Sequence, residues 1–291
     1  ETKRNTYLMY KKYLILIRMH HWVKNLLIFF PILLSFNEYS NQSIINSVYV
    51  FISFCFVSSG IYIFNDIQDA NLDKKNIRTK NRPIANGEIS HKNGYILSIL
   101  FMALSFLILT LFIPKCLIFI LLYIIINILY SIYLKYLVFL DAMAVSSGFI
   151  IRILAGGVAA DISQSLWTLL IIAFSSISFA LGKRLGQLVI NNDYLSANWN
   201  KKLLKFLFLV SILCNLIFYG LFSFDPNVAL RHESNIIWLS FPIIIAIFTR
   251  YLYIAWNGIY LGDPMDSILK DKILQSLSLI WCIIIFYIFI I

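Results

Sequence analysis

Long stretches of uncharged, apolar residues recur along this chain, and they restrict its fold more than any other feature of the sequence. Each stretch is close to the 20 residues that an α-helix needs to cross the hydrocarbon core of a bilayer. Of the 291 residues, 60% are hydrophobic and only 13% are charged, about half the usual share of charge. This composition excludes a disordered chain, a disulfide scaffold and a cytosolic enzyme, so we expect a polytopic membrane protein.

Nine apolar runs are long enough to be membrane spans. We expect these spans to be helices, because lipid cannot satisfy the backbone groups of an open strand edge and the runs lack the alternation of a membrane barrel. The predicted fold is therefore an all-α integral membrane protein with one polytopic domain over residues 1–291. The nine transmembrane helices are expected at residues 22–36, 44–64, 95–113, 116–134, 137–158, 166–182, 203–223, 236–254 and 273–291.

The net charge of +10 is distributed unevenly over the segments between the expected spans. Lys115 and Arg231 fall on one side, and all other Lys and Arg residues of these segments fall on the side of the N-terminus. The positive-inside rule then places the N-terminus in the cytoplasm, with a basic segment at residues 1–17 and polar active-site loops at 65–93 and 183–202. Since the positive charge belongs to these loops, we predict no nucleic-acid partner.

Two further features concern the ends and the cysteines. No small-residue cleavage site follows a short apolar core near the N-terminus, so we expect the first run to be a spanning helix and not a signal peptide. The four cysteines sit singly in apolar runs, without the spacing of a zinc site or of a disulfide set.

The segment after the second expected span, Asn65-Asp66-Ile67-Gln68-Asp69-Ala70-Asn71-Leu72-Asp73, carries acids at helical spacing. If the helix continues past Phe64, Asp66, Asp69 and Asp73 lie on one face, with Asn65 beside Asp69. Carboxylates this close repel one another unless a cation lies among them, and Mg²⁺ is commonly held by one or two carboxylates together with substrate phosphates. The cluster therefore predicts Mg²⁺ and a diphosphate. A solvated loop of mixed charge is the alternative, but such a loop rarely spaces its acids at helical period.

Basic residues elsewhere are candidates for binding phosphate. Lys80 and Arg82 follow the acids and would meet oxygens that the metal leaves uncovered. Arg152 lies inside the fifth expected span, where a charge costs roughly 2.5–3.5 kcal/mol, so we expect it to bind a substrate phosphate. A structural pair with Asp141 is the alternative, although Asp141 lies about three helical turns away on the same expected helix. Lys135 could line the pocket or mark the end of a span.

These residues resemble the UbiA superfamily of intramembrane prenyltransferases, whose first aspartate-rich motif is NDxxDxxxD and whose fold has nine transmembrane helices. More narrowly, the chain resembles the decaprenyl-phosphate phosphoribosyltransferase branch. Met19, His21 and Gln187 depart from the pattern of that branch. The segments that carry the resemblance are Arg18–Asn25, Lys80–Gly87, Leu140-Asp141, Gly148–Gly157, Gly182-Lys183-Arg184, Arg250-Tyr251 and Gly262-Asp263-Pro264.

The resemblance implies transfer of 5-phosphoribose from phosphoribosyl diphosphate (PRPP) to a polyprenyl phosphate in the bilayer, at the cytoplasmic face of a bacterial inner membrane. Asp66, Asp69 and Asp73 would hold Mg²⁺ as the catalytic set, and Asn65 would orient a carboxylate or bind the metal. Lys80 and Arg82 would contact the leaving diphosphate. The expected ligands of the ribose phosphate and the lipid phosphate are Arg18, Lys24, Arg152, Lys183 and Arg184. The oligomeric state stays open.

Two other functions share parts of this pattern. Aromatic polyprenyltransferases of the superfamily usually carry a second aspartate-rich segment, whereas residues 183–194 hold two strong bases and one acid. The basic segment favours two anionic substrates over a neutral aromatic acceptor. A transporter would also be polytopic, but the sequence shows no inverted repeat of Gly- or Pro-broken helices.

Overall fold

The computed structural model describes residues 12–35, 39–76, 79–189, 200–231, 236–259 and 270–290, and these residues form helices joined by turns. Seven segments are long and apolar enough to cross a membrane, and they correspond to the second to eighth expected spans. The all-helical membrane prediction is confirmed in the residues described. The long helices are α3 (Asn41–Asp73), α4 (His91–Phe112), α5 (Leu117–Ile132), α6 (Val138–Ala160), α7 (Leu166–Val189), α8 (Lys201–Phe224) and α10 (Phe241–Asn257).

The first and last expected spans look different from these seven. The described part of the first expected span is not one long helix, because a 3-10 helix, η1 (Met19–Phe29), is followed by the short α2 (Phe30–Leu34). Asn25 is fully buried within η1 and donates hydrogen bonds to Cys55 and Ser58 of α3. The apolar sequence predicts contact with lipid. In the structure, these hydrogen bonds fix η1 against α3. The last span is α12 (Lys272–Ile290), whose apolar part, Lys272–Ile288, is shorter than the seven.

Contacts divide the chain into two compact units. The first contains the chain up to Lys135 together with Ile151–Gln164, and the second contains Tyr136–Ile150 together with the chain from Ser165 onward. Helix α6 contributes residues to both units. Its last turns, with Arg152, belong to the first unit, and its first turns, with Asp141, belong to the second.

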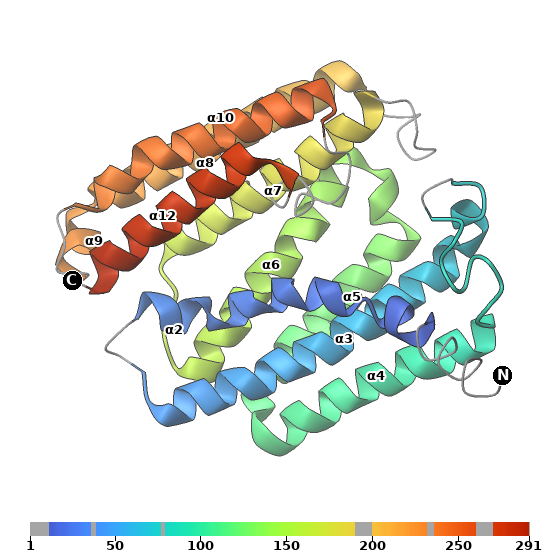
Figure 1. The fold of residues 1–291 in the computed structure, drawn as a ribbon. Coiled ribbons are helices and arrows are strands. Elements are labelled where there is room, and N and C mark those ends of the chain that lie inside the picture. Colours follow the sequence, from blue (N-terminus) through green and yellow to red (C-terminus); the bar gives the residue numbers. More distant parts are fainter. Residues whose placement is uncertain are drawn as a thin grey trace. The chain divides into compact units, whose positions relative to one another are not determined.

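In the first unit, α3 and α4 lie side by side along their length (Figure 1). Small residues allow the close approach, since a Cβ added at Gly60 would lie 2.9 Å from the carbonyl oxygen of Ser98. Hydroxyl groups of the two helices also form hydrogen bonds with each other, and Ser53 Oγ lies 2.8 Å from Ser105 Oγ. The N-terminus of α3 is fixed by a capping box between Ser40 and Ser43.

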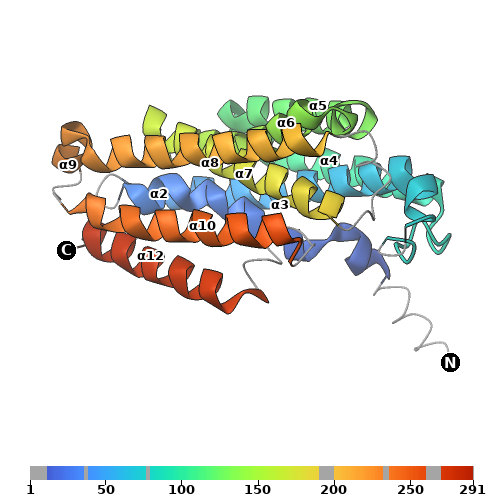
Figure 2. The ribbon, with the colours of Figure 1, turned by 90° about the horizontal axis from the view of Figure 1, so that it is seen from above.

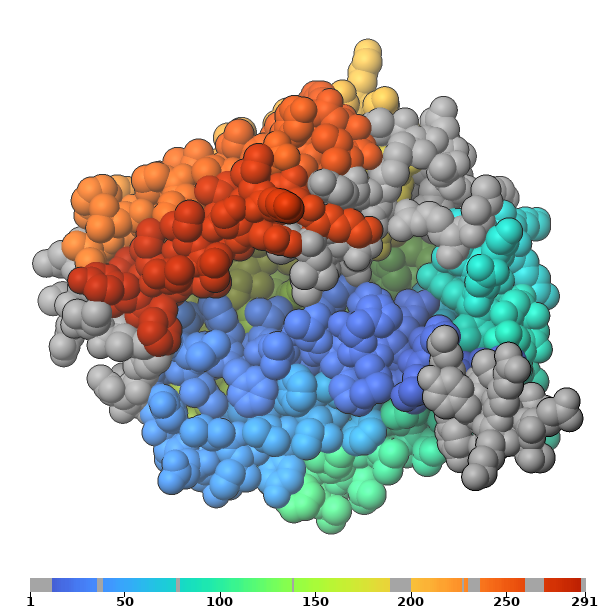
Figure 3. All heavy atoms as spheres, viewed as in Figure 1, coloured from blue at the N-terminus to red at the C-terminus, as the bar shows by residue number. Residues whose placement is uncertain are grey.

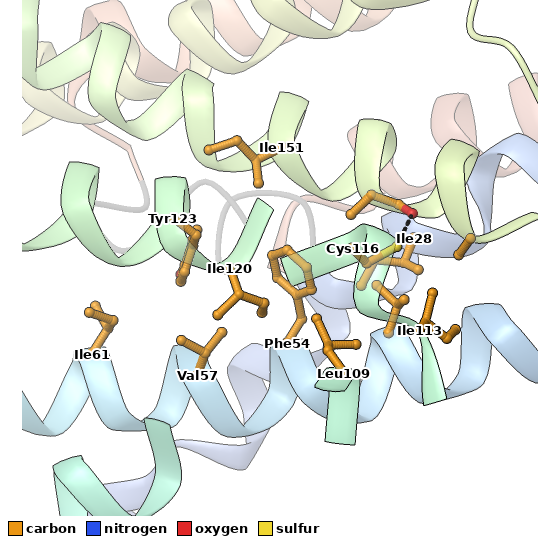
Figure 4. Close-up of a cluster of buried hydrophobic side chains, with 13 residues drawn as sticks. Ile28, Phe54, Val57, Ile61, Leu109, Ile113, Cys116, Ile120, Tyr123 and Ile151 are labelled. Carbon is orange, nitrogen blue, oxygen red and sulfur yellow. Dashed lines mark hydrogen bonds between the residues drawn. The ribbon is translucent and has the colours of Figure 1, made fainter. Parts of the chain in front are cut away.

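A buried apolar cluster holds the first unit together (Figure 4). Phe54 and Val57 of α3 contribute to it, with Leu109 of α4 and Ile151 of α6. Cys116, in the 3-10 helix η2 (Pro114–Cys116), also belongs to it, and its Sγ lies 3.7 Å from the carbonyl oxygen of Ala155. The cysteine acts as a small apolar residue, as its isolated position in the sequence predicts.

Helix η1 packs against α3 in the same unit (Figure 3). Trp22 Nε1 donates to Ser59 Oγ at 3.0 Å. The backbone of η1 also meets α6, because a Cβ added at Gly156 would lie 2.0 Å from the carbonyl oxygen of Ile28. Only glycine fits at this point of α6.

The second unit is built on α7, which packs against α8 and α10. Helices α10 and α12 lie side by side (Figure 2). Trp281 of α12 donates to the hydroxyl of Tyr219 at 2.9 Å, and that hydroxyl lies 2.8 Å from Ser240 Oγ in the 3-10 helix η5 (Ile237–Ser240). The short α9 (Pro226–Arg231) follows α8.

Candidate functional site

The acids that follow Phe64 lie on the last turns of α3. The helix continues to Asp73, so the predicted helical spacing is confirmed and residues 65–73 are helical, not a loop. Asp66 and Asp73 are buried and Asp69 is half-buried. Burial of ionised groups requires charged partners, and these come from other segments of the first unit.

Two arginines bind the first and last of these acids. Arg18, which precedes η1 in a left-handed conformation with φ 54°, donates to Asp66 Oδ1. Arg82 Nη1 lies 3.2 Å from the same oxygen and 2.7 Å from Asp73 Oδ2. One guanidinium nitrogen therefore bridges Asp66 and Asp73, so the two carboxylates converge on a single cationic point.

The remaining acid has a separate cation. Lys135 Nζ lies 2.5 Å from Asp69 Oδ1. Lys135 lies in the 3-10 helix η3 (Leu134–Tyr136), and its side chain is only 5% exposed. The residue thus contacts the acidic end of α3.

Consecutive turns place Arg82 opposite the acids. Arg82 N donates to Thr79 O and Asn86 N donates to Arg82 O, each at 2.9 Å. Ile84 packs in a small core beside Ile67 of α3, which anchors the turn to that helix. The segment ends in a turn at Asn86-Gly87, with Gly87 at φ 81°, a value that favours glycine.

The arrangement fits a divalent metal with one substrate as a further ligand. Asp66 and Asp73 already share a cation, and the buried Oδ1 of Asn65 makes no hydrogen bond, so an oxygen donor is available nearby. Among the residues the structure describes, no three His, Cys, Asp or Glu side chains are grouped closely enough to hold a metal. Mg²⁺ bound by two carboxylates and phosphate oxygens needs no such group of three.

Arg152 is buried in the first unit, where polar and aromatic side chains contact its guanidinium group. Its Nε donates to Asn25 Oδ1 at 2.7 Å and its Nη2 donates to the hydroxyl of Tyr123 at 3.1 Å. The guanidinium carbon lies 4.8 Å from the centroid of the Tyr123 ring and 5.7 Å from that of Phe54. These contacts satisfy the buried charge through hydrogen bonds and ring faces.

Asp141 has a partner other than the one considered from the sequence. Arg184 of α7 binds it through two hydrogen bonds, from Nε at 3.0 Å and from Nη2 at 2.7 Å, and also donates to Gln187 at 3.0 Å. Lys183 precedes this pair and is half-buried in the second unit. Residues 183–189 of the expected loop are therefore part of α7, and residues 190–199 lie outside the described residues.

The other two predicted phosphate ligands also belong to the first unit. Lys80 is exposed in the turn that presents Arg82, and Lys24 is half-buried on η1 beside Asn25. Gly262-Asp263-Pro264 of the last resembling segment lies outside the described residues. Sequence reasoning missed Asn25 and Tyr123 as the partners of Arg152, although a charge inside a span signals that polar partners must exist.

Residues 26–268 match the UbiA prenyltransferase family, so the chain belongs to this family. The chain is 34% identical to the decaprenyl-phosphate phosphoribosyltransferase of Mycolicibacterium smegmatis, over 91% of this chain and 88% of that protein. It is 32% identical to the protein of the same name from Corynebacterium glutamicum, over 92% and 84% of the two chains. Family and spans together identify a multi-pass membrane transferase.

Two of the solved structures with this fold illustrate the likeness. A UbiA homolog from Archaeoglobus fulgidus bound to GPP and Mg²⁺ has a TM-score of 0.71 at 21% identity, covering 96% of this chain and 98% of that one. The apo structure of a UbiA homolog from Aeropyrum pernix K1 has a TM-score of 0.63 at 17% identity, covering 90% and 98%. These likenesses establish the UbiA fold for this chain.

Proposed function

We propose that this protein transfers the 5-phosphoribosyl group of PRPP to a polyprenyl phosphate, with Mg²⁺, and releases diphosphate. The observation that carries the proposal is the bridge that Arg82 makes between Asp66 and Asp73, because it defines a cation position with phosphate-binding groups beside it. The relatives named decaprenyl-phosphate phosphoribosyltransferase, similar over nine-tenths of this chain, support the choice of substrates.

Residues at the acidic end of α3 bind the donor in this proposal. Asp66, Asp73 and the free oxygen of Asn65 would hold Mg²⁺, with Asp69 beside them. When bound, the metal neutralises charge that develops on the leaving diphosphate. Arg18, Arg82 and the exposed Lys80 bind diphosphate oxygens that the metal leaves uncovered.

Other basic residues serve the remaining phosphates or the framework. We assign Lys24 and Lys183 to the ribose phosphate and the lipid phosphate. Arg184 holds Asp141, and Arg152 holds Asn25, so we assign both arginines to positioning the segments that carry those lysines. Lys183 adjoins Arg184, and Lys24 adjoins Asn25.

The proposed reaction needs little proton transfer by the protein. A phosphate monoester has a second pKa of about 6, so the lipid phosphate is mostly ionised at neutral pH and attacks without a strong general base. Bond breaking at the anomeric carbon gives a transition state with oxocarbenium character, as in glycosyl transfer. A single displacement inverts the configuration at that carbon.

We also propose nine membrane crossings in one domain, with the N-terminus and the acidic end of α3 in the cytoplasm of a bacterial cell. The concentration of Lys and Arg on that side of the expected topology supports this orientation. To test it, Lys80 or Lys115 is replaced by cysteine, and the new thiol is labelled from either side of a sealed vesicle. Labels at both positions from the same side would contradict it.

Aromatic prenyl transfer is the second candidate, because solved structures of the same fold are bound to GPP or DMAPP with Mg²⁺. The experiment incubates the purified protein in detergent with Mg²⁺, PRPP and a polyprenyl phosphate, and follows diphosphate release and lipid mass. We expect a phosphoribosylated lipid. No such product, together with turnover of a prenyl diphosphate and an aromatic acceptor, would replace the proposal with the second candidate.

A further inference from the structure

We propose that the first turns of α8, together with Trp256 of α10, bind the headgroup of an anionic phospholipid from the surrounding bilayer. The positive charges of this site come from Lys201, Lys202 and Lys205, which we call the lysine cluster. All of these residues belong to the second unit. The inference does not depend on the proposed reaction, because none of these residues is assigned to a substrate.

The lysine cluster has no acidic partner within the second unit. Helix α8 contains no Asp or Glu, so its three positive charges are unbalanced on their own helix. In the part of this unit that the structure describes, Arg184 pairs with Asp141 and Arg250 pairs with Asp271, but no acid pairs with the cluster. The helix macrodipole also opposes cations at the N-terminal end of a helix. The cluster therefore fits an anion that comes from outside α8.

An aromatic ring fixes the position of one lysine. The Nζ of Lys205 lies 3.9 Å from the centroid of the Trp256 ring, a cation–π contact between α8 and α10. Trp256 lies one residue before the end of α10, and tryptophan is enriched at the headgroup level of membranes. The contact holds an ammonium group at that level without neutralising its charge. Lys201 lies one helical turn earlier on the same face of α8.

The surface of α8 that continues from the cluster is apolar and exposed. Lys202 is followed at helical spacing by a row of three apolar residues, Phe206, Leu209 and Leu213. Phe206 is 62% exposed and Leu213 is 58% exposed. In a membrane span, such a face contacts the lipid chains. A phospholipid presents a charged headgroup and then hydrocarbon in the same order, whereas a free phosphate ion would use the lysines alone.

A phospholipid also fits this surface better than a polyprenyl phosphate substrate. The apolar row is open to the bilayer, and the cluster contains no carboxylate that could hold the metal of a transfer reaction. Lysines at a membrane surface each raise the affinity for anionic lipid by about fivefold. Three of them should favour an anionic lipid over a neutral one by about 100-fold.

The test measures lipid binding to the purified protein in a neutral detergent by native mass spectrometry. The probes are a short-chain phosphatidylglycerol and a phosphatidylcholine with the same chains. We expect the anionic lipid to bind about 100-fold more tightly, and Lys201→Gln, Lys202→Gln and Lys205→Gln each to weaken its binding about fivefold. Equal affinity for the two lipids, or a preference that these three variants leave unchanged, would overturn the inference.

Lys115→Gln is the matched control, because Lys115 is a lysine with a 49% exposed side chain in the first unit. This variant should bind the anionic lipid as the unmodified protein does, and a fivefold loss would show that any exposed lysine contributes equally. Replacing the whole lysine cluster by arginine keeps its charge and should keep the affinity. A loss in the arginine variant as large as that from glutamine would contradict a role for the charge.

The contribution of Trp256 is tested by a double variant. If the ring acts by holding Lys205, Trp256→Leu should weaken binding, and Trp256→Leu with Lys205→Gln should lose little more than Lys205→Gln alone. Full additivity would remove Trp256 from the site. Competition separates the sources of the phosphate: displacement of the lipid by an equal concentration of inorganic phosphate, or tighter binding of a polyprenyl phosphate to the cluster, would overturn the choice of a phospholipid.

Discussion

Arg152 Nε donates to Asn25 Oδ1 at 2.7 Å, so a charge within a membrane span is held by a neutral amide from η1. Both side chains are buried, and they are 127 positions apart in the chain. Because η1 carries Lys24 and follows Arg18, this bond connects the framework of the first unit to two of the proposed phosphate ligands. The contact suggests that Arg152 serves the site through its position.

Arg152→Met and Asn25→Leu should each destabilise the protein by about 1.5–3 kcal/mol, the range for hydrogen bonds to charged groups. The double variant should lose less stability than the two single variants added together, because each single variant already removes the bond between Arg152 and Asn25. Thermal unfolding in detergent measures all three variants. Strict additivity would show that Arg152 and Asn25 are not energetically coupled.

Gly156→Ala should destabilise the first unit by about 1–3 kcal/mol, because the new methyl group would lie 2.0 Å from the carbonyl oxygen of Ile28 and backbone must move. Gly220→Ala is the control, since its nearest neighbour is the ring of Phe241 at 3.3 Å, which is a side chain. The measurement is the melting temperature of each variant. Equal melting temperatures would contradict the close packing of η1 on α6.

The pair formed by Arg250 and Asp271 predicts a dependence of stability on pH. Hydrogen bonds from Arg250, with Nη2 at 2.7 Å, hold the pKa of Asp271 below its ordinary value of 3.8. A lowered pKa in the folded state means that the stabilisation is fully present above pH 3.8 and is lost as pH falls through the folded pKa. Asp271 also caps α12, with Leu274 N at 2.8 Å from its Oδ1.

Melting temperatures of the unmodified protein and of Asp271→Asn, taken from pH 6 downward, test this pair. The variant should be less stable at pH 6, and the difference should shrink as pH falls below about 4. Asp161→Asn, at an exposed position, should follow the unmodified protein at every pH. A difference that stays constant with pH would contradict the assignment.

Local patterns in the sequence predict the acids of this site. They do not predict the partners of those acids, which come from distant parts of the chain. The spacing of Asp66, Asp69 and Asp73 predicts their common face because α3 simply continues past Phe64. Lys135 pairs with Asp69 across 66 positions and Arg184 with Asp141 across 43. Helical periodicity carries no information about contacts at such separations.

The fold shows the same division between local and long-range information. Apolar length predicts α3 to α8 and α10, whose hydrophobic runs leave no other structure available in lipid. Residues 22–34 of the first expected span instead form part of η1 and α2, and the buried Asn25 bonds to α3 and to Arg152. Polar anchors of this kind depend on the tertiary structure, so composition does not reveal them.

The most direct measurement of the central claim is the rate of diphosphate release from PRPP, with polyprenyl phosphate and increasing Mg²⁺, for Asp66→Asn, Asp73→Asn and the exposed control Asp161→Asn. We expect the first two variants to lose about 100-fold or more in rate and to require more Mg²⁺, because each removes a metal ligand that balances leaving-group charge. The control should match the unmodified enzyme. Unchanged rate and Mg²⁺ dependence in Asp66→Asn and Asp73→Asn would contradict the account.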